Sequence, residues 1–320
     1  MVTETILAKN IIAAGEKAAY DAACKRLLAN KIILAWIMKC CLEEYRDFGV
    51  EEIATKYIEG DPQVSQGSVN PDEDSGYGGD QIKGAKTEDS TIKEGTITYD
   101  IRFYAVVPCS GEMVSLIINI EAQNDFYPGY PIIKRGIYYC GRMISSQYGV
   151  EFTDNHYEHI KKVYSIWICA NPPKYRENTI NRYTIQEDNL VGEIKEKKEH
   201  YDLLTVIMIC LGHDGDDKYA GILKLLDVLL SSEKDPEEKK KILHHDFDIR
   251  MTKTLESEVQ VMCNLSKGIE EKGMEKGMEK GILVSIQNLM DSMGWTAEKA
   301  MKALKIPETE RTMYADYIRK

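Results

Sequence analysis

Two carboxylates and an amide near the middle of the chain have the spacing of a metal-binding site on a β-hairpin. Asp100 lies in residues 96–107, where polar and apolar side chains alternate. Glu121 and Gln123 lie in residues 113–123, which are rich in β-branched and long aliphatic side chains. Both patterns favour strands, and the turn residues Pro, Cys, Ser and Gly separate them. The sequence therefore predicts one hairpin that carries acidic side chains.

The length of the turn determines which residues of this hairpin face each other. If Val107 pairs with Glu112, Asp100 lies opposite Asn119, and Glu121 is its diagonal neighbour. Diagonal neighbours lie about 7–8 Å apart at the backbone, near enough for two carboxylates to share a divalent cation. Oxygen ligands suit Mg2+ or Mn2+, and a bound cation relieves the repulsion between the carboxylates. The hairpin is thus a predicted metal site.

The same residues resemble a known nuclease signature. An aspartate followed on the next strand by Glu-x-Lys is typical of PD-(D/E)XK phosphodiesterases, and Asp100 with Glu121-Ala122-Gln123 looks like the Glu-x-Gln variant. The resemblance extends more loosely from about Tyr20 to the C-terminus. Three longer runs resemble the recombination-promoting nuclease and putative transposase family of this superfamily: EGTITYDIRFYAVVP, IINIEAQNDFYPGYPIIKRGIYYCGRMISSQYG and KKVYSIWICANPP.

This resemblance implies a metal-dependent endonuclease that hydrolyses DNA phosphodiester bonds and promotes recombination or mobile-element activity. Asp100 and Glu121 would hold one or two Mg2+ (or Mn2+) ions, and the carbonyl of Ala122 would complete the ligand set. Such ions polarise the phosphate, lower the pKa of the attacking water and stabilise the leaving oxygen. Gln123 occupies the lysine position, where its amide orients water but cannot neutralise developing charge. The expected catalytic residues are Asp100, Glu121 and Gln123.

The stretch after the predicted metal strand is more basic than the chain as a whole. Residues 129–182 contain eight Lys or Arg and four acidic residues, whereas the whole chain has a net charge of −11. DNA phosphates require clustered basic side chains. We therefore expect Lys134, Arg135 and Arg142, on a helix predicted over residues 132–148, to bind DNA. Either Lys134 or Arg135 would also replace the missing lysine. A solvated helix face explains the same charges, and the alternative function is a catalytically inactive DNA-binding or protein-interaction module that retains the nuclease fold.

Periodicity predicts an α/β fold around these residues. Apolar side chains at three- and four-residue spacing predict a helix over residues 21–45, which Asn30 interrupts. The continuous apolar run at 163–170 predicts a strand buried on both faces. Residues 179–186 and 201–211 predict two further strands. With the resemblance, this gives a restriction-endonuclease-like central mixed sheet flanked by helices, followed by a helical C-terminal extension.

Composition divides the chain into four segments. Residues 1–215 form the predicted nuclease-like domain, and their Gly-, Pro- and acid-rich stretch at 60–94 is expected to be a mobile surface loop. Residues 216–266 are a helical extension and 282–320 a small helical tail, which would recognise DNA or a partner, or would only stabilise the fold. Residues 267–281, with their repeated Gly-Met-Glu-Lys, predict a helical linker. Self-association into a homo-oligomer is the alternative role of the repeat.

Several classes of protein are not favoured. No segment approaches about 18 uninterrupted apolar residues and no signal sequence is evident, which predicts a cytoplasmic protein without a membrane partner. The eight cysteines lack a CxxC pattern, so reduced thiols are expected. The spacing of His213, Asp214, His244 and His245 does not favour a transition-metal cluster. Glu44, an acidic residue of the leading helical region, stays outside the predicted metal site.

Overall fold

The computed structural model divides into two compact units, Met1–Cys263 and Asn264–Lys320. Both contain helices, and the first also contains the β-sheets, so the expected mixed α/β class is confirmed. None of the described helices is both long and apolar enough to cross a membrane. The structure describes residues 6–65, 88–91, 95–108, 110, 113–121, 126, 128–212, 221–231 and 234–318.

The main sheet of the first unit has six strands in the order β1-β4-β5-β6-β8-β7. β5, β6 and β8 are parallel to one another, and the remaining pairs are antiparallel. A separate two-stranded sheet pairs β2 with β3. The strands are β1 (Ile58–Val64), β2 (Glu88–Thr91), β3 (Gly95–Thr98), β4 (Ile101–Val106), β5 (Met113–Glu121), β6 (Val163–Cys169), β7 (Thr179–Thr184) and β8 (Leu204–Cys210).

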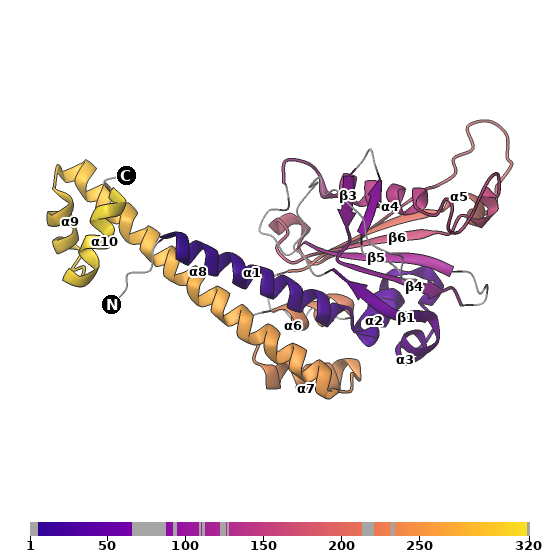
Figure 1. Ribbon diagram of the computed structural model, residues 1–320, viewed down its shortest axis with the longest axis horizontal. Coiled ribbons are helices and arrows are strands. Elements are labelled where there is room, and N and C mark those ends of the chain that lie inside the picture. The colour runs from indigo at the N-terminus through magenta and orange to yellow at the C-terminus, as the bar shows by residue number, and fades with distance from the viewer. Residues whose placement is uncertain are drawn as a thin grey trace. The chain divides into compact units, whose positions relative to one another are not determined.

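Helices cover both faces of the main sheet, with α4 on one face and α2 on the other (Figure 1). The helices of the first unit are α1 (Ile6–Leu28), α2 (Lys31–Cys41), α3 (Val50–Glu52), α4 (Ile132–Ser145), α5 (Lys198–Tyr201), α6 (Ile222–Leu230) and α7 (Pro236–Phe247), with the short turns η1 (Glu43–Tyr45), η2 (Ile53–Tyr57), η3 (Tyr157–His159) and η4 (Lys174–Arg176). Helix α8 (Lys253–Met293) begins in the first unit, and α9 (Ala297–Ala303) and α10 (Glu308–Ile318) complete the second.

Every residue of β6 is buried because side chains on both faces of this central strand are covered. Val163, Trp167 and Cys169 belong to the core cluster beneath α4. Tyr164 and Ile168 point the opposite way, since successive side chains of a strand alternate between faces. The prediction of a doubly buried strand is therefore confirmed.

The hairpin of β4 and β5 forms in the predicted register, with Ile101 opposite Ile118 and Val106 opposite Met113. The expectation of one continuous strand from 96 to 107 is wrong, because β3 and β4 belong to different sheets. The chain bends between them, where Tyr99 is fully buried and Asp100 is 2% exposed. At this bend, two successive side chains are both buried, so the alternation of buried and exposed side chains that is typical of a strand is interrupted.

The expectation that residues 60–94 form only a loop is also wrong, because its start contains most of β1, which pairs with β4, and its end contains β2, which pairs with β3. The sequence of β1, IEGDPQV, is polar and contains Pro62. Proline is tolerated on an edge strand, and the register of β1 shifts between Glu59 and Gln63, around the proline. Backbone pairing with β4, rather than an apolar side-chain pattern, therefore stabilises this strand. Residues 66–87 and 92–94 lie outside the described residues, so the mobility expected of them stays a prediction.

Three helices begin at residues whose side chains accept capping hydrogen bonds. Asn30, where the sequence predicted an interruption, ends one helix and begins α2 by accepting a hydrogen bond from the backbone N–H of Ile32 at 3.0 Å. Asp235 begins α7 and Thr296 begins α9 in the same manner. The predicted linker at 267–281 is the middle part of α8. The second unit begins at Asn264, three residues before this linker, and α6 and α7 belong to the first unit.

Candidate functional site

Asp100 lies at the bend before β4 and its carboxylate is bound by a lysine of α1. The Lys25 Nζ atom is 2.8 Å from Asp100 Oδ1 and 2.6 Å from Asp21 Oδ2. The side chains of Lys25 and Asp100 are 2% and 3% exposed, and that of Asp21 is 24% exposed. The backbone carbonyl of Asp100 also accepts a hydrogen bond from the N–H of Ser65, after β1, at 2.9 Å. Asp100 thus joins α1, β1 and β4.

The charges of this cluster favour an ionised lysine. Burial by itself lowers the pKa of Lys25, but the neighbouring Asp100 and Asp21 outweigh it, and the pKa is raised above its ordinary value. Two carboxylates and one ammonium are therefore in direct contact at this point of the described structure.

The backbone of Glu121 lies at the carboxyl end of β5, paired with Cys169 of β6. The register of β4 and β5, continued by one residue, places Asp100 opposite Asn119, as predicted, and Glu121 two residues further along. The Ala122 and Gln123 positions lie outside the described residues, and only the backbone register of Glu121 is described. The structure therefore brings the predicted strand ends together and leaves the roles of these three residues as predictions.

The predicted DNA-binding residues lie on α4 with different exposures. Lys134 is exposed, Arg135 is half-buried, and Arg142 is only 3% exposed. The guanidinium of Arg135 donates to the hydroxyl of Tyr139 at 2.9 Å and lies 5.6 Å from the ring of Trp167. Arg142 is enclosed, and its Nη1 atom lies 3.4 Å from the hydroxyl of Tyr138. The role of these three residues in DNA binding stays a prediction.

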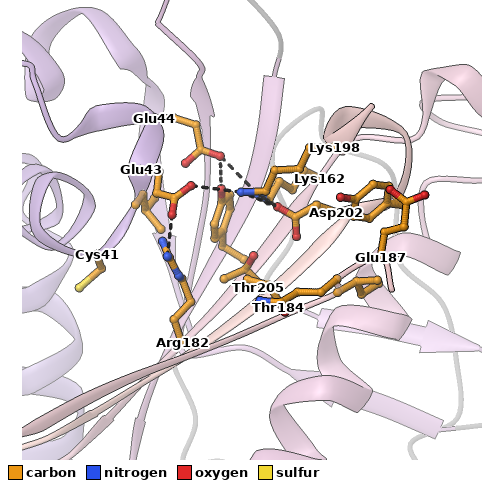
Figure 2. Close-up of a pocket in the computed structure, with 15 residues that line it drawn as sticks. Cys41, Glu43, Glu44, Lys162, Arg182, Thr184, Glu187, Lys198, Asp202 and Thr205 are labelled. Carbon is orange, nitrogen blue, oxygen red and sulfur yellow. Dashed lines mark hydrogen bonds and ion pairs between the residues drawn. The ribbon is translucent and has the colours of Figure 1, made fainter. Parts of the chain in front are cut away.

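A pocket of about 380 Å³ lies elsewhere, where η1 meets the amino ends of β6 and β8. Figure 2 shows its charged side chains pointing toward one another. Lys162 of this pocket is 2.8 Å from Asp202 and 3.4 Å from Glu44. Arg182 and Lys198 both contact Glu43, at 2.6 and 3.2 Å. Each of these basic side chains is thus paired with a carboxylate.

Glu44 lies in this pocket and not beside Asp100. Its carboxylate accepts a hydrogen bond from the hydroxyl of Tyr164. Burial, followed by the charge of Glu44, raises the pKa of Tyr164, so the phenol stays protonated. Across the sheet, Asp100 lies level with Asn119 of β5, and Asn119 pairs with Trp167 of β6. Lys162 precedes Trp167 by five residues, which is about 16 Å along the strand at 3.3 Å per residue. The ion pairs of this pocket therefore connect η1 to the sheet, at a distance from Asp100.

Lys25 and Asp21 are the candidate site residues that sequence reasoning missed. One signal was present, because Lys25 lies between the apolar residues Cys24 and Leu27 on a predicted buried helix face. A lysine at such a position requires a charged or carbonyl partner. The identity of that partner, 75 residues away in the chain, could not be deduced from spacing.

No family model, curated protein or solved structure matches this chain.

Proposed function

We propose that this chain is a metal-dependent DNA endonuclease of the PD-(D/E)XK type, with a restriction-endonuclease-like core formed by β1, β4, β5, α4 and β6. The observation that carries the proposal is the Lys25 ammonium 2.8 Å from Asp100. Gln123 stands where this nuclease signature has a lysine, and a glutamine cannot neutralise the charge that develops on a phosphate. Lys25, from α1, supplies a positive charge beside the first acidic residue of the signature instead.

The residues around Asp100 fit a divalent cation in ligand type. Asp100 and Asp21 both contact the Lys25 ammonium, and carboxylate oxygens are the ligands that Mg2+ and Mn2+ prefer. Asp100 and Glu121 would hold the ion, with the carbonyl of Ala122. A bound ion of this kind supplies Lewis-acid activation of water and phosphate.

In this proposal, side chains of the protein orient the Asp100 carboxylate, the attacking water and the DNA backbone. Lys25 orients the Asp100 carboxylate and holds positive charge at the site. Gln123 orients the attacking water. Lys134 and Arg135 hold the DNA backbone next to the hairpin, because α4 follows β5 directly in the chain. The expected substrate is DNA in the setting of recombination or mobile-element activity.

The same ion pair favours a second candidate function, a catalytically inactive DNA-binding or protein-interaction module. A buried lysine that neutralises an aspartate can serve the fold alone, as structural ion pairs do. Both side chains are almost fully enclosed in the described structure. In this case the nuclease fold would present α4 or the C-terminal helices to a partner without turnover.

Plasmid cleavage separates the two functions. Supercoiled plasmid is incubated with Mg2+ or Mn2+, or with EDTA, and with wild type, Asp100→Asn, Glu121→Gln, Lys25→Met or Lys239→Met. We expect nicking by wild type that EDTA abolishes and that the first three variants lose by at least about 100-fold, the order of magnitude for one transition-state charge contact. Lys239→Met removes another buried lysine, at a position outside the site, and should retain cleavage.

Equal cleavage by wild type, Asp100→Asn and Glu121→Gln would rule out the proposed site. No cleavage with any metal, combined with DNA binding by wild type that weakens as salt increases, would support the inactive module. Cleavage by Lys25→Met at the wild-type rate would show that Lys25 has no role in cleavage, while the roles proposed for Asp100 and Glu121 would stand. A folded protein that neither binds nor cuts DNA would contradict both functions.

A further inference from the structure

Two histidines and a glutamate gather on the loop between α4 and β6. His156, Glu158 and His159 each offer a ligand atom, and these atoms all lie within 4.8 Å of one another. The Nδ1 atom of His156 is 2.9 Å from Glu158 Oε1, and the Nε2 atom of His159 is 3.8 Å from the same oxygen. The three side chains are 61–63% exposed, so an ion reaches them from solvent without any opening of the fold.

The backbone that carries these side chains is held at both ends. The side-chain amide of Gln147, after α4, accepts a hydrogen bond from the N–H of Lys161 at 2.7 Å and donates one to the Lys161 carbonyl at 2.9 Å. Between them Phe152 is 8% exposed, and its ring contacts the rings of Tyr148 and Tyr157 at 5.5 and 5.7 Å. The loop is therefore closed by two hydrogen bonds and anchored by one buried aromatic ring.

Within this loop a 3₁₀ turn brings the three ligands to one side. Residues Tyr157–His159 form η3, and the N–H of His159 donates to the carbonyl of His156 at 3.2 Å. The imidazole rings of His156 and His159 consequently lie 5.9 Å apart, centre to centre. The backbone geometry is set before any ion binds, so binding has to order only the side chains.

We propose that His156, Glu158 and His159 form a binding site for a divalent transition-metal ion, with Zn2+ the best match. Two imidazole nitrogens and one carboxylate oxygen are ligands of the kind that Zn2+ takes, and water would fill the remaining position. Tetrahedral ligand bonds of about 2.0–2.2 Å place the donor atoms roughly 3.4 Å from one another. The pair at 2.9 Å would therefore open slightly and the wider pairs would close, which exposed side chains achieve by rotation. Mg2+ is disfavoured because imidazole suits the transition metals. The site is independent of the proposed nuclease centre.

Glu158 is the negatively charged member of the proposed ligand set. Without a metal, the ring of His156 donates a hydrogen bond to Glu158, which lowers the pKa of the Glu158 carboxyl below its ordinary value. The carboxylate is therefore ionised near neutral pH.

Calorimetric titration with Zn2+ after chelator treatment tests the site. All proteins carry Cys40→Ser, because Cys40 is an exposed thiol that competes for zinc. We expect the parent protein to bind, and His156→Ala and His159→Ala each to weaken binding by at least about tenfold, since loss of even an outer-shell partner costs 10–100-fold. The matched control is His244→Ala/His245→Ala, which removes two neighbouring imidazoles of α7 and should bind as the parent does.

Imidazole ¹⁵N spectra supply the second measurement. The chain has six histidines, and Zn2+ should shift the nitrogen resonances of two of them, which His156→Ala and His159→Ala identify. Equal binding by the parent and the His156→Ala/His159→Ala variant overturns the proposal. So does loss of binding in the α7 control alone. Because the ligands are surface side chains, near-unchanged circular dichroism of the variants shows that they fold.

Discussion

Lys25 and Lys239 are both almost fully buried, at 1% and 0% exposure, yet their surroundings differ. Lys239 donates to the backbone carbonyls of Leu229 and Ser231, at 3.1 and 2.7 Å, and burial lowers its pKa. Lys25 instead faces two carboxylates, which raise its pKa. Of these two lysines, Lys25 is therefore the one that contacts the carboxylates of the proposed site.

Removal of Lys25 should destabilise the protein because it leaves Asp100 charged and enclosed. We expect Lys25→Met to lower the free energy of unfolding by about 3–5 kcal/mol, as for other broken buried ion pairs. Lys25→Met combined with Asp100→Asn removes both charges and should recover part of this loss, while cleavage of plasmid stays absent. Urea denaturation at pH 7 gives the stabilities.

Wild-type stability in Lys25→Met would show that the ion pair contributes nothing to folding. A double variant no more stable than Lys25→Met would show that the loss does not arise from the unpaired Asp100 charge. The two readouts separate folding from activity, because the double variant can be folded and inactive.

Helix α4 approaches the sheet closely at one glycine. A Cβ atom at Gly136 would lie 2.7 Å from Val206 Cγ1 and 2.9 Å from Trp167 Nε1. Such a contact is shorter than packed side chains tolerate. The absence of a side chain at this position therefore lets α4 rest on β6 and β8 and sets the rotation of the helix.

Gly136→Ala should accordingly destabilise the protein although alanine is the better helix former. Overpacking costs about 1–3 kcal/mol, whereas the gain in helix propensity is about 1 kcal/mol. The matched control is Gly141→Ala on the same helix, where an added Cβ meets nothing within 4 Å and which should be stabilising by about 0.5–1 kcal/mol. Thermal unfolding of the two variants measures the difference, and equal changes in Tm would contradict the close approach.

At the scale of the molecule, the second unit has a hydrophobic core of its own. Ile286, Ala300, Met301, Ile306 and Tyr314 are buried together, with exposures of 0–4%. These residues come from α8, α9, α10 and the turn before α10. The tail therefore has apolar residues of its own around which it folds.

Met301→Ala should loosen this core without affecting the sheet of the first unit. The loss of a buried methionine side chain costs about 2–5 kcal/mol. Hydrogen exchange should therefore accelerate in α9 and α10 and stay unchanged in β6. Met293→Ala, at a residue that is 59% exposed, should leave both regions as in wild type. Faster exchange in β6 of Met301→Ala would indicate that the two units share stability.

Local patterns of the sequence were sufficient for several features because the interactions that decide them are local. The register of β4 and β5 follows from the length of one turn, and it is the register that the structure contains. The interruption at Asn30 depends on its own side chain and the next turn of backbone. The buried strand β6 follows from its continuous apolar run.

Tertiary structure decided what depends on partners far apart in the chain. Ile137 is 46% exposed although its spacing from Ile133 and Cys140 places it on an apolar face, because the close approach at Gly136 sets the rotation of α4. The polar strand β1 exists because the backbone of β4 pairs with it. The acidic position at Asp100 was visible in the sequence by itself. Its ammonium partner was not, since folding alone brings α1 to the bend before β4, where a buried charge needs an opposite charge beside it.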